Sequence, residues 1–162
     1  MQKFEKATFG GGCFWGIEEA FRTLKGVKSA TSGYMGGKIK NPTYEQVCAD
    51  NTAHVEVVQI EFDPKEISYE QLVTGFWSLI NPTTTNRQGF DIGSQYRSVI
   101  FYHSEEQKKI AQKSKEELEK SGKYKNKMVT AIEPAKEFFP AEEYHQKYYL
   151  KQGMEGKQCN IF

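Results

Sequence analysis

A cysteine in a glycine-rich turn is the feature of this 162-residue chain with the clearest capacity for chemistry. Residues 10–16 read Gly-Gly-Gly-Cys-Phe-Trp-Gly, between a predicted strand and a predicted helix that Cys13 would open. Glycine accepts positive φ angles and close backbone approach, and the first N–H groups of a helix favour an anion. Such a position can lower a cysteine pKa from ~8.5 toward ~3.5–7.5, which makes Cys13 a candidate nucleophile. The turn alone also fits an inert buried cysteine or a phosphate-binding loop.

Two aromatic residues follow this cysteine directly. Phe14 and Trp15 are too close in sequence to share one face of a helix, so at least one ring must point somewhere other than the core. A ring that the core does not use can line a pocket. The sequence therefore favours an apolar wall beside Cys13.

The clearest predicted strand carries a carboxylate on its apolar face. Along residues 54–62, alternation puts Glu56 on the face of Ile60 and Phe62. An isolated buried carboxylate is costly, so Glu56 is expected to be paired with a cation or partly protonated, which makes it a general-acid candidate. The alternative is that Glu56 lies at a solvated end of the strand. His54 shares this face, and a core or hydrogen-bonding role is favoured for it.

Composition argues against several classes of partner and of site. The 22 basic and 21 acidic residues give a formal net charge of +1, so neither nucleic acid nor an anionic membrane is expected as a partner. No apolar run approaches the ~18 residues of a membrane span, and residues 1–6 lack the apolar stretch of a secretory signal, so we expect a cytoplasmic protein. Three cysteines without a Cys-x-x-Cys pair argue against a disulfide scaffold, a zinc site or a thioredoxin-type dithiol.

The order of the predicted elements indicates an α+β fold. Strand, helix, strand, strand, helix and strand, then a further helix and strand, fit a ferredoxin-like split βαβ sandwich core with an added helix, an added strand and a long C-terminal segment. We expect residues 1–162 to form a single catalytic domain. The long irregular stretches 34–53 and 81–95 are expected to carry function. The predicted strands are 4–9, 27–33, 54–62, 96–102 and 128–132, and the predicted helices are 13–25, 68–80 and 104–121.

Several separated motifs resemble those of the A-type peptide methionine sulfoxide reductases, which are methionine-S-sulfoxide reductases. The likeness covers nearly the whole chain, and the motifs occur in the order expected for that family. It implies a thiol-dependent reduction of methionine-S-sulfoxide, protein-bound and possibly free, to methionine, which repairs oxidative damage. The matching residues are 12–16, 33–37, 41–44, His54 with Glu56, 87–89, Asp91, Gly93, 95–98, 140–142 and 145–146.

The resemblance also implies catalytic roles. Cys13 would attack the sulfoxide sulfur, Glu56 would donate a proton to the oxygen, Tyr44 and Tyr96 would hold that oxygen, and Asp91 would help to organise the site. This set meets the chemical need, because a thiolate displaces the sulfoxide oxygen only if that oxygen is being protonated. Tyrosine hydroxyls are suitable donors to a developing oxyanion. Without the resemblance, both tyrosines would be read as ordinary loop and strand residues.

Roles for a methyl pocket and a second thiol follow from the same resemblance. Phe14 and Trp15 would receive the methyl group of the sulfoxide, whose burial is worth about 1 kcal/mol per carbon. A fixed methyl pocket and a fixed acid would select the S epimer. Reduction would leave Cys13 as a sulfenic acid, and Cys159 would condense with it to give a Cys13–Cys159 disulfide. Cys48 is the competing resolving cysteine.

The expected partners are a reductant and a sulfoxide. Thioredoxin would reduce the disulfide by exchange, with dithiothreitol able to replace it in vitro. Oxidised proteins or free methionine sulfoxide would be the substrate. No bound cofactor and no metal are expected, and the protein is expected to be a monomer.

The chain departs from the family pattern in three ways. Ala53 stands where glycine usually precedes the histidine, and Phe90 stands where asparagine usually precedes the aspartate. Both changes affect the expected rim of the pocket. Only one cysteine lies in the C-terminal tail, which implies a single disulfide step.

Other classes of function use a similar cysteine. A cysteine acyltransferase or thiol hydrolase would need a base and an oxyanion hole aligned with a carbonyl, and thioester turnover would identify it. A redox sensor or a phosphate-binding module would use the glycine turn without catalysis. Reduction of the S epimer that is lost in Cys13→Ser separates the reductase from all of these.

Overall fold

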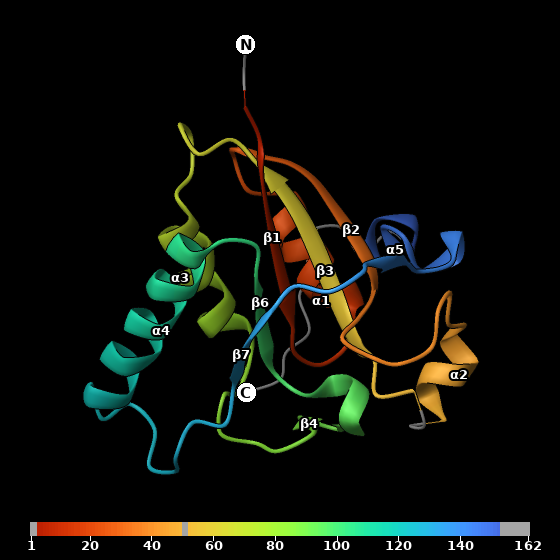
Figure 1. Cartoon of the computed structure of the whole chain (residues 1–162). Helices are drawn as coiled ribbons and strands as arrows, with labels where there is room; N and C mark the ends of the chain where they lie inside the picture. The colour runs from red at the N-terminus through yellow and green to blue at the C-terminus, as the bar shows by residue number, and fades with distance from the viewer. Residues whose placement is uncertain (1–2, 50–51, 153–162) are drawn as a thin grey trace.

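A six-stranded sheet forms the centre of the protein (Figure 1). The structure is a computed structural model, and it describes residues 3–49 and 52–152. Neighbouring strands follow the order β7-β6-β1-β3-β2-β8. The strands are β1 Glu5–Gly10, β2 Val27–Met35, β3 Val55–Phe62, β6 Val99–Tyr102, β7 Ala131–Pro134 and β8 Phe139–Pro140.

The four central strands have the ferredoxin-like topology that the sequence predicts. β1 pairs antiparallel with both β3 and β6, and β2 pairs antiparallel with β3, which gives the order β6-β1-β3-β2. One helix connects β1 to β2 and another connects β3 to β6, as in a split βαβ unit. β7 adds a parallel strand at one edge, and the short β8 extends the other edge. The α+β prediction is therefore confirmed.

The helices begin at the capping residues that their sequences supply. Ser68 and Gln71 form the predicted capping box of α3. Ser104 caps α4 in the same way, but the side chain of Gln107 accepts the N–H of His103 in place of closing the box. Among the described residues, no helix combines the length and apolar composition needed to cross a membrane. The helices are α1 Phe14–Arg22, α2 Tyr44–Cys48, α3 Tyr69–Leu79, α4 Glu105–Lys120 and α5 Tyr148–Lys151, with 3-10 turns η1 Ser94–Tyr96 and η2 Glu143–His145.

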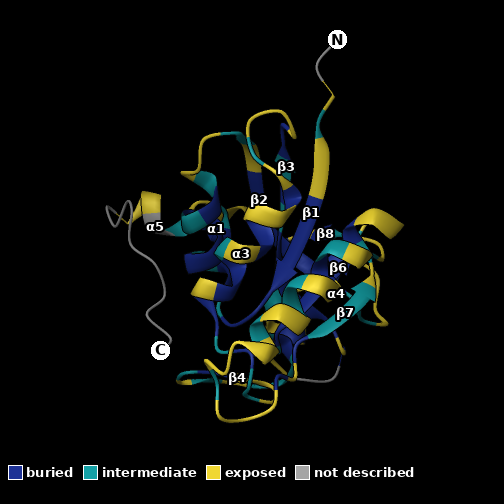
Figure 2. Ribbon diagram, turned by 90° about the vertical axis from the view of Figure 1, so that its left-hand side faces the viewer, coloured by how far each residue is buried: buried dark blue, intermediate teal, exposed yellow. Residues whose placement is uncertain are grey.

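The main hydrophobic core lies between the sheet and the helices α1, α3 and α4. Phe9 of β1 stacks on Phe21 of α1 at 5.3 Å and on Phe76 of α3 at 4.9 Å between ring centroids. A smaller core on the opposite face packs Val57 of β3 and its neighbours against Phe138. Buried residues concentrate on the central strands, and the outer side of α4 is exposed (Figure 2). Alternation along β3 therefore turns its even-numbered residues toward the helices.

Two predicted strand boundaries are wrong. The strand expected at 96–102 begins only at Val99, because residues 94–96 form the turn η1. The strand expected at 128–132 occupies 131–134, since an edge strand forms only where its neighbour offers a partner, and Val99 is paired with Ala131.

The two stretches expected to be irregular contain short elements. The end of β2 and the helix α2 lie within 34–53. Within 81–95, β4 Arg87–Gln88 and β5 Asp91–Ile92 pair as a small antiparallel hairpin. These elements are too short to produce a periodic apolar pattern, which explains why the sequence does not reveal them.

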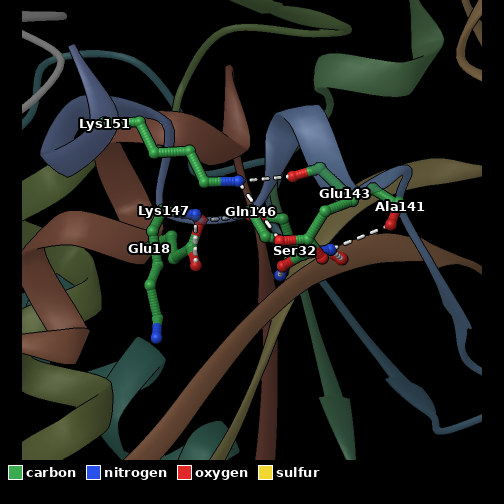
Figure 3. A network of polar contacts seen from close by, with 7 residues as sticks. All are labelled: Glu18, Ser32, Ala141, Glu143, Gln146, Lys147 and Lys151. Carbon is green, nitrogen blue, oxygen red and sulfur yellow. Dashed lines mark hydrogen bonds and ion pairs between the residues drawn. The ribbon is translucent and has the colours of Figure 1, made fainter.

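A buried polar network ties the C-terminal segment to the sheet and to α1 (Figure 3). The carboxylate of Glu18 accepts the Ser32 hydroxyl at 2.9 Å and the backbone N–H of Lys147 at 2.9 and 3.0 Å. The amide of Gln146 donates to the carbonyls of Ser32 and Ala141 and accepts the N–H of Ser32. Burial raises the pKa of Glu18, and the hydrogen bonds from the Lys147 N–H and the Ser32 hydroxyl oppose part of the rise. The network fixes residues 141–147 beside β2.

Glu18→Ala is expected to lower the free energy of unfolding by about 3 kcal/mol, because the Ser32 hydroxyl and the Lys147 N–H lose their buried acceptor. Urea unfolding followed by circular dichroism measures this change. Glu18→Gln keeps an acceptor oxygen and should recover part of the loss. Glu117→Ala on the exposed side of α4 is the control, expected to change stability by less than about 0.5 kcal/mol. An equal loss in Glu18→Ala and in the control would contradict the prediction.

Candidate active site

Cys13 occupies the N-cap position of α1, as the sequence predicts, and it is half-buried. The preceding turn is tightly packed: a Cβ at Gly11 would lie 2.6 Å from Cγ2 of Ile80. Gly12 has a φ of 75° and donates its N–H to the carbonyl of Tyr96 at 3.0 Å. The turn therefore needs glycine both for space and for backbone conformation, and it holds the cysteine against the end of α3 and against η1.

Glu56 lies on β3 with a side chain that is only 1% exposed. Its Oε1 accepts the backbone N–H of Phe14, the first residue of α1, at 3.4 Å. The prediction of a buried carboxylate is confirmed, and the alternative of a solvated strand end is excluded. The carboxylate of Glu56 therefore binds the N–H of the residue that directly follows Cys13, at the start of α1.

Two tyrosines from separate elements, Tyr44 of α2 and Tyr96 of η1, interact electrostatically with this carboxylate. Burial raises the pKa of Tyr44, and a hydrogen bond with Cys48 and the charge of Glu56 raise it further. Burial also raises the pKa of Tyr96, with the charges of Glu56, Cys48 and Asp91 adding to the rise. Both hydroxyls consequently stay protonated, and can donate hydrogen bonds, throughout the physiological pH range.

Asp91 reaches the cysteine turn from the β4–β5 hairpin. Burial raises the pKa of its carboxyl, and a hydrogen bond with the Cys13 backbone opposes part of the rise. On the partner strand, the buried side chain of Gln88 accepts the N–H of Asn81 and donates to the Asn81 carbonyl, both at 2.8 Å. These bonds fix β4 to the segment that follows α3, while Asp91 joins the hairpin to the cysteine turn.

The two rings after Cys13 have different surroundings. Phe14 is fully buried in the main core, with its ring centroid 5.8 Å from Tyr34 and 5.2 Å from His145. Trp15 is half-buried, stacks on Tyr148 at 3.8 Å, and donates its indole N–H to Nδ1 of His145 at 2.9 Å. The prediction that one ring would leave the core is confirmed, and that ring is Trp15.

His145 is a site residue for which sequence reasoning gave no role. Its side chain is 1% exposed, and its ring lies 4.3 Å from Tyr44 and 4.1 Å from Tyr144 between centroids. Burial lowers the pKa of His145, although the charges of nearby carboxylates oppose the change. Because an indole N–H can only donate, Nδ1 is the acceptor and the neutral ring carries its proton on Nε2.

Glu142 is a second residue without a role assigned from the sequence. Its carboxylate accepts the Tyr34 hydroxyl and the Tyr44 N–H, both at 3.0 Å. Burial alone would raise the pKa of Glu142, but these hydrogen bonds outweigh it and the pKa is lowered. The dense run of acidic and aromatic residues at 142–148 was the signal available for both residues.

The remaining residues singled out in the sequence have other positions. Nδ1 of His54 accepts the N–H of Gly37 at 3.0 Å, and its Nε2 lies 2.6 Å from the Ile39 carbonyl, which is the hydrogen-bonding role favoured above. Cys48 ends α2 and is exposed, with its sulfur in a hydrogen bond to Tyr44. The proposed resolving residue, Cys159, lies outside the described residues.

Both substituted family positions are visible at the surface. Ala53 has a φ of 61°, a left-handed conformation that glycine adopts freely and that costs another residue about 1 kcal/mol. Phe90 lies at the tip of the β4–β5 hairpin and is 100% exposed. In the part of the chain that the structure describes, no group of three or more His, Cys, Asp or Glu side chains could hold a metal ion.

The assembled groups provide a nucleophile, an acid and an apolar wall. Cys13 supplies a sulfur at a helix N-terminus, and Glu56 supplies a buried carboxyl one peptide away. The hydroxyls of Tyr44 and Tyr96 are suited to binding an oxygen that gains negative charge. This set suits attack on an electrophile that releases or transfers an oxygen next to an apolar group.

Comparison with known proteins identifies the family. A family model described as peptide methionine sulfoxide reductase matches residues 5–161. The chain is 57% identical over 151 residues to "Peptide methionine sulfoxide reductase MsrA" of Methanothermobacter thermautotrophicus, covering 93% of this chain and 89% of the relative. Mxr1 from Saccharomyces cerevisiae in reduced form has a TM-score of 0.89 at 37% identity, covering 98% of this chain and 91% of that chain. Mxr1 in complex with Trx2 has a TM-score of 0.64 at 28% identity, covering 90% and 85%. The chain belongs to the A-type peptide methionine sulfoxide reductase family.

Proposed function

We propose that this protein reduces methionine-S-sulfoxide to methionine with Cys13 as the nucleophile and Glu56 as the acid. One observation carries the proposal: the buried Glu56 carboxylate bonds to the N–H of Phe14, the residue that follows Cys13. Membership of the family supports the same reaction. The two groups required by the chemistry therefore lie at one helix start.

In the first step, the Cys13 thiolate attacks the sulfur of the sulfoxide. A bond forms between the two sulfur atoms, and the substrate oxygen, protonated by Glu56 and by a second proton from solvent, leaves as water. Water then attacks the Cys13 sulfur, the sulfur–sulfur bond breaks, and the proton released returns to Glu56. Thiol and sulfoxide are thereby converted to sulfenic acid and thioether, with two electrons passing from the cysteine sulfur to the substrate. The N–H groups at the start of α1 stabilise the attacking thiolate.

Hydrogen-bond donors around the oxygen make this step possible at neutral pH. Tyr44 and Tyr96 retain their protons, since burial raises the pKa of each, and both donate to the oxygen as its negative charge grows. Asp91, bonded to the Cys13 backbone, holds the cysteine turn in place. Glu142 holds Tyr44 through its backbone N–H.

The methyl group of the substrate packs against Phe14 and Trp15. Trp15 stacks on Tyr148 and donates a hydrogen bond to His145, so its ring is held in one orientation. The sulfur of methionine sulfoxide is a stereocentre that carries the methyl group, the side-chain carbon, the oxygen and a lone pair. When the methyl group, the oxygen and the attacking thiolate each have a fixed place, only one epimer fits.

The sulfenic acid is then resolved by a second thiol. Cys159 attacks the oxidised sulfur of Cys13, the oxygen leaves as water, and a Cys13–Cys159 disulfide forms. A thioredoxin restores both thiols by exchange and becomes oxidised itself. The structure of Mxr1 in complex with Trx2 supports a thioredoxin as the reductant. Since thiols supply the electrons, the cycle requires no bound cofactor.

The proposed reaction is tested by supplying each sulfoxide epimer with thioredoxin, thioredoxin reductase and NADPH. We expect NADPH consumption with methionine-S-sulfoxide, none above background with the R epimer, and none with Cys13→Ser. Equal rates with the two epimers would contradict the methyl wall. Activity that survives in Cys13→Ser would remove Cys13 from its role.

Glu56→Gln is expected to slow the sulfoxide step by about 10²–10⁴-fold at pH 7, because an amide cannot supply the proton. Single-turnover formation of methionine in rapid quench, without reductant, measures this step alone. Glu61→Gln on the same strand is the matched control and should react at the wild-type rate. Near-normal turnover in Glu56→Gln would show that another group is the acid.

After one turnover without reductant, Cys13 and Cys159 are expected to be joined in a disulfide. Peptide mapping by mass spectrometry under acid quench identifies the bond. Cys48→Ser should leave it unchanged, whereas Cys159→Ser should accumulate the sulfenic acid, which dimedone traps. A Cys13–Cys48 bond in the wild-type protein would identify Cys48 as the resolving cysteine instead.

A further inference from the structure

One buried tyrosine lies close to two carboxyl groups. Tyr34 is fully buried, and its hydroxyl donates a hydrogen bond to Oε1 of Glu142 at 3.0 Å. Across β2 and β3, Tyr34 pairs directly with Glu56, which places the two side chains next to each other on one face of the sheet. Burial raises the pKa of Tyr34, and the charges of Glu142 and Glu56 both raise it further. Tyr34 therefore links the surroundings of the two carboxyl groups.

The helix α2 also contacts both carboxyl groups. Burial raises the pKa of Cys48 at the end of this helix, and the charges of Glu56 and Glu142 contribute to the rise. At the start of the helix, the N–H of Tyr44 donates to Oε2 of Glu142 at 3.0 Å. Tyr34 and α2 thus place Glu142 within electrostatic reach of Glu56.

The surroundings of the two carboxyl groups favour different protonation states. The half-buried Glu142 accepts hydrogen bonds from the Tyr34 hydroxyl, the Tyr44 N–H and its own N–H. Burial alone would raise the pKa of Glu142, but these bonds lower it, so this group is ionised at neutral pH. Glu56 is only 1% exposed, and burial disfavours its charged form. Two carboxyl groups with such different surroundings are suited to the roles of fixed anion and proton donor.

We propose that Glu142 is a positioning residue that acts through Glu56: its fixed negative charge keeps the Glu56 carboxyl protonated at neutral pH. This inference rests on the proposed function, and it adds the group that maintains the acid. A neighbouring anion repels the charge that ionisation would create on Glu56. Without that anion, Glu56 would ionise at a lower pH, and less of the protein at pH 7 would hold a proton for the sulfoxide oxygen.

Other titratable groups also face Glu56, and they come from several elements. They are Tyr34 of β2, Tyr44 and Cys48 of α2, Tyr96 of η1 and Cys13 at the start of α1. Burial raises the pKa of the three tyrosines and of Cys48, so these four groups are uncharged at pH 7. Cys13 ionises in the proposed reaction, and its titration must therefore be separated from that of Glu56.

Nuclear magnetic resonance can follow the ionisation of Glu56 through the N–H of Phe14, which binds its carboxyl group. A Cys13→Ser background removes the titration of the thiol. No serine precedes a phenylalanine elsewhere in the sequence, so labelling with carbonyl-13C serine and 15N phenylalanine gives one HNCO signal, from this N–H. The pH at the midpoint of its shift measures the ionisation of Glu56.

In this background, Glu142→Gln keeps the shape of the side chain, removes its charge, and should lower the midpoint by about one pH unit. Glu142→Asp keeps the charge and should restore most of the difference. Glu143→Gln removes an exposed charge from the next residue and is the matched control, expected to leave the midpoint unchanged. Circular dichroism checks that each variant is folded.

The same change should appear in catalysis when Cys13 is present. In single turnover without reductant, the alkaline limb of the pH–rate profile should move to lower pH by about one unit in Glu142→Gln, which lowers the rate on that limb about 10-fold. A purely structural role would lower the rate by the same factor at every pH.

The outcomes distinguish this inference from the proposed function. An unchanged midpoint in Glu142→Gln would overturn the inference, and so would an equal shift in Glu142→Asp or in Glu143→Gln. A shifted midpoint in a protein that reduces neither sulfoxide epimer would refute the proposed function, while it would support the coupling of the two carboxyl groups.

Discussion

The first turn of α1 is the constraint on which the candidate site depends. A helix begins with backbone N–H groups that have no partner within the helix, and here one of them meets the buried carboxylate of Glu56. The residue immediately before this N–H is Cys13. One segment of backbone, packed through its glycines against α3 and η1, therefore sets the separation of sulfur and carboxyl. Rigid elements hold both groups, which is the arrangement that precise chemistry requires.

The rest of the site is brought to this turn from distant parts of the chain. α2 supplies Tyr44, η1 supplies Tyr96, and the C-terminal segment supplies His145 behind Trp15. Hydrogen bonds to carboxylates fix these segments in place: the half-buried Glu142 holds Tyr44, and the buried Glu18 holds the C-terminal backbone through the network of Figure 3. Such networks define a unique packing because an unpaired buried polar group is expensive. A substitution far from Cys13 can thus alter the site through the C-terminal segment.

The fold could be predicted from the sequence wherever a pattern is local. The alternation along β3 placed Glu56 inside, and the glycine turn placed Cys13 at a helix start; both follow from periods of two and 3.6 residues. The bounds of β7 could not be found, since they depend on pairing with β6, which is distant in sequence. His145 and Glu142, although they lie in matching motifs, could not be given a role for a similar reason. They lie in a short 3-10 turn and its cap, where no period exists, and their importance arises only from contacts with Trp15 and Tyr44.

The indole N–H of Trp15 donates a hydrogen bond to the lone pair on Nδ1 of His145, which makes the position of Trp15 depend on the charge of that histidine. Nδ1 of His145 can accept the indole proton only while the imidazole is uncharged. Burial weakens the affinity of this imidazole for a second proton, so the lone pair persists at an acidity that would already charge a solvent-facing histidine. The hydrogen bond that orients Trp15 therefore persists in a mildly acidic medium. Its geometry is lost only when the medium becomes acidic enough to force a cation into that enclosure.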